Sequence, residues 1–127
     1  MKTAISIITA GLLIALFIIL LNDADSKEEV GSFDNIEIND GVQYITILAK
    51  GGYSPSVTNA ESGIPTILIM KTDNTYDCSL ALVIRSINFQ EMLEPNGEKV
   101  IDLGTPKPGT LRGLCSMGMY NFSINFN

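Results

Sequence analysis

Hydrophobic residues are distributed in two different ways along this chain. Residues 4–21 form one apolar run without a charged side chain, interrupted only by Ser6, Thr9 and Gly11. From Gly41 onward the apolar runs are short, and Gly, Pro, Asn and Asp residues separate them. A long uncharged run predicts a membrane helix, whereas short runs between turn residues predict strands.

The N-terminal run predicts a single transmembrane helix within residues 1–22. As a helix, the 18 residues of the apolar run 4–21 would extend about 27 Å, close to the hydrocarbon thickness of a bilayer. Lys2 precedes the run and acidic residues follow it, so the positive-inside bias places the N-terminus in the cytoplasm. We therefore expect a single-pass protein of the cell membrane, with its domain on the extracytoplasmic side, at a cell surface or in a periplasm. A cleaved signal peptide is the alternative, and it would also export the domain.

Residues 23–40 are acidic and contain few apolar side chains, which is typical of a tether. The sequence leaves open a short first strand within this segment, because Phe33, Ile36 and Ile38 are apolar. Residues 41–127 are expected to form the folded domain. The predicted strands in this domain are 42–49, 64–71, 79–84, 99–103, 110–114 and 120–126.

The last predicted strand alternates most regularly between apolar and polar residues. Its apolar positions are Tyr120, Phe122, Ile124 and Phe126, and Asn121, Ser123 and Asn125 lie between them. One apolar face and one polar face predict a half-buried strand of a two-layer structure. Residues 88–93 lack this alternation, and we expect a short helix or an irregular loop there. Strands at this spacing over about 85 residues predict an all-β Greek-key sandwich.

Charge and histidine content narrow the range of functions. The residues after the N-terminal run include 7 basic and 14 acidic side chains, a net charge of −7. This charge argues against nucleic acid or an anionic lipid surface as a partner. The chain has no histidine, so the usual general base and the usual zinc and redox-copper ligand are missing. The carboxylates are scattered, and we expect no enzyme activity.

Soft sulfur donors gather near the C-terminus. Cys115, Met117 and Met119 lie within five residues around Gly118, and Cys78 lies 37 positions before Cys115. A glycine tolerates positive φ, so the chain is able to fold back there and bring Cys115 and Met119 together. Thiolate and thioether sulfur select Cu(I) over hard cations. Cys78, Cys115, Met117 and Met119 are therefore the predicted ligands of a Cu(I) site.

The two cysteines equally permit a disulfide between Cys78 and Cys115. Neighbouring cysteines of an exported protein commonly oxidise, and closing a loop of about 38 residues would stabilise a small domain by roughly 3–4 kcal/mol. The sequence leaves both interpretations open, and they are compatible, because reduction of the bridge would expose the metal ligands. A thiol-exchange enzyme is less favoured, since no Cys-x-x-Cys motif is present.

Five short motifs follow one another in the predicted domain. They are Gly52-Tyr53-Ser54-Pro55, Gly63-Ile64-Pro65, Asp77-Cys78-Ser79, Thr105-Pro106-x-x-Gly109 and Cys115-Ser116-Met117-Gly118-Met119. This order resembles the histidine-free cupredoxin-like domains of exported bacterial proteins and metal-transport membrane proteins. By that resemblance, Cys78 takes the place of the first copper histidine of a blue-copper protein. Cys115 takes the place of its copper cysteine, and Met119 resembles its axial methionine.

The chain also departs from the blue-copper pattern. A blue-copper protein has a histidine between its copper cysteine and its methionine, where this chain has Ser116, Met117 and Gly118. Without imidazole ligands the site is expected to favour Cu(I), and fast electron transfer is not expected. The resemblance implies copper retention, sensing or delivery, with a metal-exchange protein as a partner. The alternative is a structural or interaction domain, such as an assembly subunit, held by the disulfide.

Overall fold

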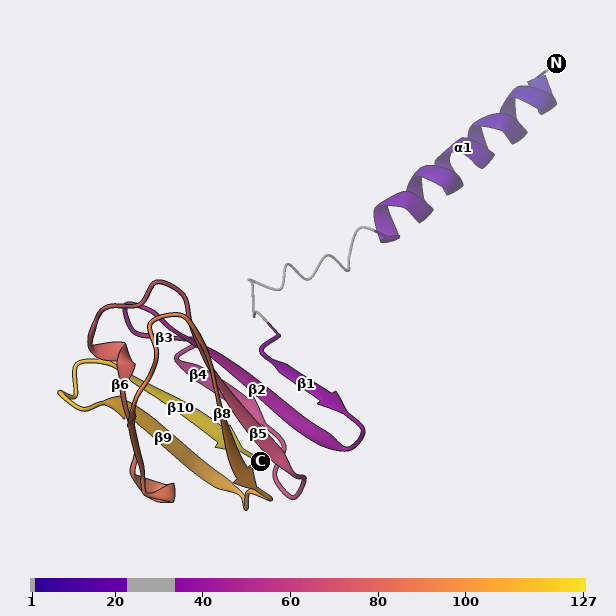
Figure 1. Ribbon diagram of the computed structural model, residues 1–127. Coiled ribbons are helices and arrows are strands. Elements are labelled where there is room, and N and C mark those ends of the chain that lie inside the picture. The colour runs from indigo at the N-terminus through magenta and orange to yellow at the C-terminus, as the bar shows by residue number, and fades with distance from the viewer. Residues whose placement is uncertain (1, 23–33) are drawn as a thin grey trace. The chain divides into compact units, whose positions relative to one another are not determined.

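The computed structural model describes residues 2–22 and 34–127, which belong to two separate units (Figure 1). The first unit contains one helix, α1 (Lys2–Asn22). The prediction of a helix in this segment is confirmed. A helix that spans a bilayer needs about 20 consecutive apolar residues. Within the described parts of the chain, no helix combines the length and the apolar character that crossing a membrane requires, so the predicted transmembrane span is not supported.

Residues 34–127 form two β-sheets that pack against each other (Figure 1). The first sheet has the order β1–β2–β5–β8, with β3 also paired to β2. Its strands are β1 (Ile36–Asn39), β2 (Val42–Ala49), β3 (Tyr53–Ser54), β5 (Thr66–Thr72) and β8 (Gly97–Gly104). The predicted all-β sandwich is confirmed.

The second sheet has the order β4–β10–β9–β6–β7. Its strands are β4 (Val57–Ala60), β6 (Ala81–Ile84), β7 (Phe89–Met92), β9 (Gly109–Cys115) and β10 (Asn121–Phe126). Two short 3₁₀ helices, η1 (Cys78–Leu80) and η2 (Arg85–Ile87), lie before and after β6. The pairs β2–β5 and β4–β10 are parallel, and parallel neighbours require a crossover. The chain accordingly passes to β4 in the second sheet before it returns to β5.

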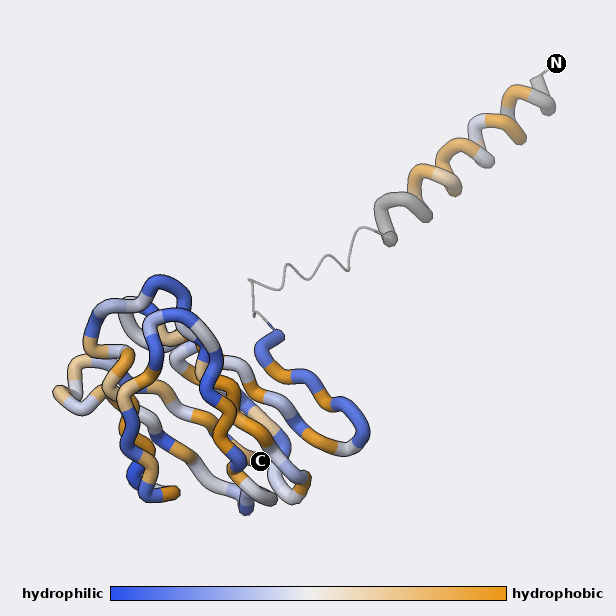
Figure 2. The backbone as a smooth tube through the Cα atoms, viewed as in Figure 1, coloured by the Kyte–Doolittle hydropathy of each residue, from blue (hydrophilic) through white to orange (hydrophobic). Residues whose placement is uncertain are grey.

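The core lies between the two sheets and is made of the alternate side chains that face inward. The first sheet contributes Ile45, Ile47, Leu68 and Met70, and the second contributes Leu82, Ile84, Phe122 and Ile124. Figure 2 shows apolar residues along much of these strands and hydrophilic residues in several of the connecting loops. The predicted inner face of the last strand is confirmed, because its apolar residues at 122, 124 and 126 are buried.

The structure differs from the sequence prediction in several segments. Strands β3 and β4 were not predicted, and residues 79 and 80 of the predicted strand 79–84 belong to η1. Residues 88–93 were expected to form a helix or a loop, but β7 pairs antiparallel with β6. The backbone of this segment forms hydrogen bonds with the neighbouring strand β6. The residue pattern of the segment alone does not predict this pairing, because strand formation depends on the neighbouring strand. Strand β1 lies inside the predicted tether and pairs with β2, so the short first strand left open by the sequence is present. Residues 23–33 of the predicted tether lie outside the described residues.

Candidate metal site

Cys78 and Cys115 are joined by a disulfide that connects η1 to β9. Their Cα atoms lie 5.8 Å apart, although 37 positions separate them in the sequence. Cys115 is fully buried and Cys78 is half-buried. The structure therefore places the two cysteines together, as both sequence interpretations require, and it shows them in the disulfide form.

The chain turns tightly between β9 and β10, immediately after Cys115. The Gly118 N–H donates to the Cys115 carbonyl at 2.8 Å, and the Cys115 N–H donates to the Tyr120 carbonyl at 3.0 Å. The Tyr120 N–H also donates to Cys115 Sγ at 3.4 Å. Gly118 has φ of +72°, in the left-handed region that favours glycine, as the sequence predicted. Backbone hydrogen bonds thus hold both Cys115 and the turn that follows it.

The turn carries the other two predicted ligands on its surface. The side chain of Met117 is 79% exposed and that of Met119 is 66% exposed. Neither thioether is therefore part of the packed core. All four sulfur residues predicted from the sequence belong to the disulfide or to the turn beside it. They do not form a closed ligand shell in this form of the protein.

A second set of hydrogen bonds ties the segment that carries Cys78 to the loop between β2 and β3. Asp77 accepts from the Gly51 N–H and from the Ser79 N–H, both at 2.8 Å. Ser79 Oγ accepts from the Gly52 N–H, also at 2.8 Å. Hydrogen bonding from the side chain and then the backbone of Ser79 is the main cause that lowers the pKa of the Asp77 carboxyl. Asp77 is therefore ionised beside Cys78 at neutral pH.

Tyr53 supports the same segment from the core. Its hydroxyl donates to the Ser79 carbonyl at 3.1 Å, and its ring packs edge to face against Phe122 at 5.1 Å between ring centroids. Burial, with a smaller effect from the charge of Asp77, raises the pKa of Tyr53 to about 12. The local sequence pattern does not predict this network, because the contacts of Tyr53, Asp77 and Ser79 are made with residues that are distant in the sequence.

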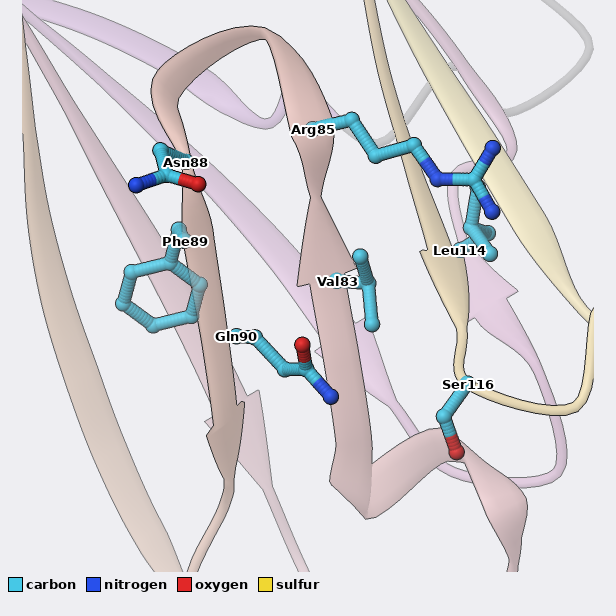
Figure 3. A pocket seen from close by; sticks show the side chains of 7 residues that line it. All are labelled: Val83, Arg85, Asn88, Phe89, Gln90, Leu114 and Ser116. Carbon is cyan, nitrogen blue, oxygen red and sulfur yellow. The ribbon is translucent and has the colours of Figure 1, made fainter.

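A shallow pocket of about 280 Å³ lies over β6, β7 and β9 (Figure 3). It is lined by Val83, Arg85, Asn88, Phe89, Gln90, Leu114 and Ser116. In Figure 3 the Arg85 side chain extends toward Leu114. The lining contains no thiol, thioether or carboxylate, so this pocket offers no ligand suited to a soft metal ion.

Sulfur is the donor that the site itself supplies. Among the described residues, no group of three or more His, Cys, Asp or Glu side chains is placed to hold a metal ion. The disulfide sulfurs lack the charge of thiolates, so the oxidised pair does not fit Cu(I). After reduction, two thiolates from neighbouring positions and the thioethers of the adjoining turn make a donor set that suits this soft ion.

The sequence profile of the cupredoxin-like domain family matches residues 10–123. No curated protein sequence matches the chain. Among solved structures, the fold is similar to the metal-binding domain of the Streptococcus pneumoniae D39 Cu(I)-exporting P-type ATPase CopA with Cu(I), at 24% identity and a TM-score of 0.65. That match covers 72% of this chain and 92% of the other.

The fold is also similar to an apo copper-binding protein solved by NMR, at 19% identity and a TM-score of 0.64. That match covers 72% of this chain and 94% of the other. A chain of a heme-copper terminal oxidase dimer matches over 99% of this chain and 98% of its own length, with 16% identity and a TM-score of 0.50. At these identities the matches show a shared fold.

Proposed function

The chain belongs to the cupredoxin-like domain family, and from this premise we propose that it is a copper-binding module whose reduced form holds Cu(I). One observation carries the proposal. Cys78 and Cys115 meet at the base of the turn that bears the exposed Met117 and Met119. Two solved structures of similar fold, the CopA metal-binding domain with Cu(I) and the apo copper-binding protein, support copper as the ion.

The residue types favour Cu(I) over Cu(II). The chain has no histidine, and a blue-copper centre requires imidazole ligands. Two thiolates from Cys78 and Cys115 would bind one Cu(I) with a net charge of −1, and thioether sulfur from Met117 or Met119 would complete the coordination without adding charge. The proposed task is therefore retention, sensing or delivery of copper, with no catalytic step and no electron transfer.

The oxidation state of the cysteines decides when the module binds copper. The structure has the disulfide, which is the form expected to persist in an oxidising compartment. We place the domain on the extracytoplasmic side for this reason. In this proposal the protein takes up copper only after reduction, and the exposed thioethers are the ligands that a metal-exchange protein reaches first.

An anaerobic Cu(I) titration of the purified full chain against a competing chelator tests the proposal. We expect the reduced protein to take up one Cu(I) per chain and to lose both reactive thiols. The oxidised protein should take up none at the same chelator concentration. A reduced protein that takes up no Cu(I) would show that the proposal is wrong.

Met-to-Leu exchanges test the ligand assignment without large effects on the fold, because they usually cost less than about 1.5 kcal/mol. The double variant Met117→Leu with Met119→Leu should bind Cu(I) more weakly. Met70→Leu is the matched control, since Met70 is 1% exposed in the core and cannot act as a ligand there. Unchanged affinity in the double variant would remove the methionines from the site.

A second function is supported by the disulfide itself. The bridge joins elements that are distant in the sequence, so the domain is also suited to a purely structural or interaction role. In that case the reduced chain shows no affinity for Cu(I). The titration described above separates the two functions.

A further inference from the structure

The two sulfur atoms of the disulfide belong to residues with unequal access to solvent. Cys115 is the last residue of β9, lies opposite Leu82 in the β6–β9 pair, and has no exposed surface. Cys78 is the first residue of η1 and is half-buried. The two residues before Cys78 are exposed, and Tyr76 has 77% of its surface in solvent.

This difference decides which sulfur a reductant is able to reach. Thiol–disulfide exchange begins when a thiolate attacks one sulfur, and the other sulfur leaves. Attack on Cys115 would require the β9–β10 turn to open, because hydrogen bonds from Gly118 and Tyr120 close the chain around this residue. We propose that Cys78 is the sulfur at which an external thiol opens the disulfide, and that Cys115 is the leaving sulfur.

The surroundings of Cys115 also suit a leaving sulfur. The Tyr120 N–H points at Cys115 Sγ from 3.4 Å. The Tyr120 carbonyl also accepts a hydrogen bond from the Cys115 N–H, so the position of this donor does not depend on the S–S bond alone. A backbone donor of this kind stabilises negative charge that develops on sulfur. Cys78 has no corresponding hydrogen bond to its sulfur among the described contacts.

The exchange proceeds in two steps, with an external thiol as the reductant. In the first step a bond forms between the thiol sulfur and Cys78 Sγ, the Cys78–Cys115 bond breaks, and its electron pair leaves with Cys115 as a thiolate. In the second step another thiolate attacks the external sulfur of this mixed disulfide and releases Cys78 as a thiolate. Two external thiols become one disulfide, and the protein gains their two electrons. The two protons released by the external thiols protonate Cys78 and Cys115 when both become thiols.

The significance for copper rests on the proposed function, because the same exchange would create the two thiolate ligands. A mixed disulfide on Cys78 would leave Cys115 free but block the site, so copper uptake would begin only after the second step. The position of attack is nevertheless a property of the disulfide alone. The position of attack is measured without copper. An experiment is therefore able to refute the attack at Cys78 without refuting Cu(I) binding, and the reverse also holds.

Mass spectrometry of the oxidised full chain treated with reduced glutathione tests the position of attack. The reaction is quenched with acid, and the chain is then unfolded and its free thiols are blocked with N-ethylmaleimide. Trypsin cleaves after Lys71, Arg85 and Arg112, so the two cysteines fall in separate peptides. We expect the glutathione adduct on Cys78 to exceed that on Cys115 by roughly tenfold or more, with N-ethylmaleimide on Cys115. Equal adducts, or more adduct on Cys115, would overturn the proposal.

Single-cysteine variants give the same comparison without reclosure of the disulfide. Cys115→Ser leaves only the Cys78 thiol, and Cys78→Ser leaves only the Cys115 thiol. With a bulky aromatic disulfide reagent, the first variant should react roughly tenfold faster or more, and the difference should disappear in urea. Equal rates in the folded proteins would overturn the proposal. A reduced protein that binds no Cu(I) would instead refute the proposed function and leave the assignment of Cys78 intact.

Discussion

The ring of Phe122 lies directly over Gly113, the residue opposite it in the β9–β10 pair. A Cβ atom at position 113 would lie 2.2 Å from two carbon atoms of this ring. Phe122 is fully buried and also packs against Tyr53. The contact therefore packs a large core side chain of β10 over β9, the strand that leads into the turn after Cys115.

Gly113→Ala is expected to destabilise the domain by about 1–3 kcal/mol, because the added methyl group forces the buried Phe122 ring to move. Urea unfolding of the oxidised protein measures this change. In a Phe122→Leu background the smaller side chain leaves room, so the same alanine should cost less. An equal cost in both backgrounds would contradict the assigned contact.

Reduction of the disulfide is expected to lower the free energy of unfolding by about 3–4 kcal/mol, since the bridge closes a loop of about 38 residues in the unfolded chain. Urea unfolding with and without reductant measures the difference. The variant with both Cys78→Ala and Cys115→Ala provides a control without thiols, whose stability should not respond to reductant. A difference below about 1 kcal/mol would show that the bridge contributes little to stability.

The Asp77 carboxylate caps η1 and accepts a hydrogen bond from Gly51 in the loop between β2 and β3. Asp77→Ala should therefore lower the free energy of unfolding by about 0.5–2 kcal/mol at pH 7. The pKa of Asp77 is lowered from its ordinary value of 3.8, so its ionised form stabilises the fold above that pH. This contribution is lost as the pH falls below about 4 and passes through the lowered pKa.

Asp77→Asn separates charge from hydrogen bonding, because asparagine is also a good N-cap but does not titrate. It should keep most of the stability at pH 7 and lose the part of the acid dependence that Asp77 causes. Unfolding free energies measured between pH 2 and pH 7 test this expectation. An unchanged acid dependence in Asp77→Asn would contradict the role given to the carboxylate.

Tyr53 should be a late-titrating tyrosine, because its pKa is raised to about 12. The folded state holds this proton more tightly than the unfolded state, so the contribution to stability is present below pH 10 and is lost as the pH rises toward 12. Phenolate absorbance measured against pH should show one of the four tyrosines ionising near pH 12. Tyr53→Phe should remove that step, and persistence of the step would assign it to another tyrosine.

Several elements of the fold follow from local sequence patterns. The bounds predicted for the strand 42–49 agree with β2, and the alternation after Tyr120 predicts the inner face of β10. Asp40 and Gly41 lie between β1 and β2 with φ of +51° and +77°. An Asp-Gly pair favours this conformation, so these two residues by themselves predict the hairpin turn that joins β1, with Ile36 and Ile38, to β2.

Other elements depend on contacts that no local pattern contains. Strand β7 forms because β6 offers it a free edge, whereas its own residues show no clear alternation. The Gly51 N–H donates to the Asp77 carboxylate and the Tyr53 hydroxyl donates to the Ser79 carbonyl, and each of these hydrogen bonds connects residues 26 positions apart. The N-terminal segment was predicted to be a helix and is one, but a membrane span is not supported by the described residues.

The candidate site likewise has features that follow from the sequence and features that depend on tertiary contacts. The sequence by itself determined the chemistry that is available, because a chain without histidine that carries two cysteines and a Cys-x-Met-Gly-Met segment offers sulfur as its soft donor. The tertiary structure decided that Cys78 meets Cys115 as a disulfide, with one partner half-buried and the other fully buried. The physical reason is that residue identity sets the affinity of a group for a ligand. Distance and exposure depend instead on how η1 and β9, which are far apart in the sequence, pack together.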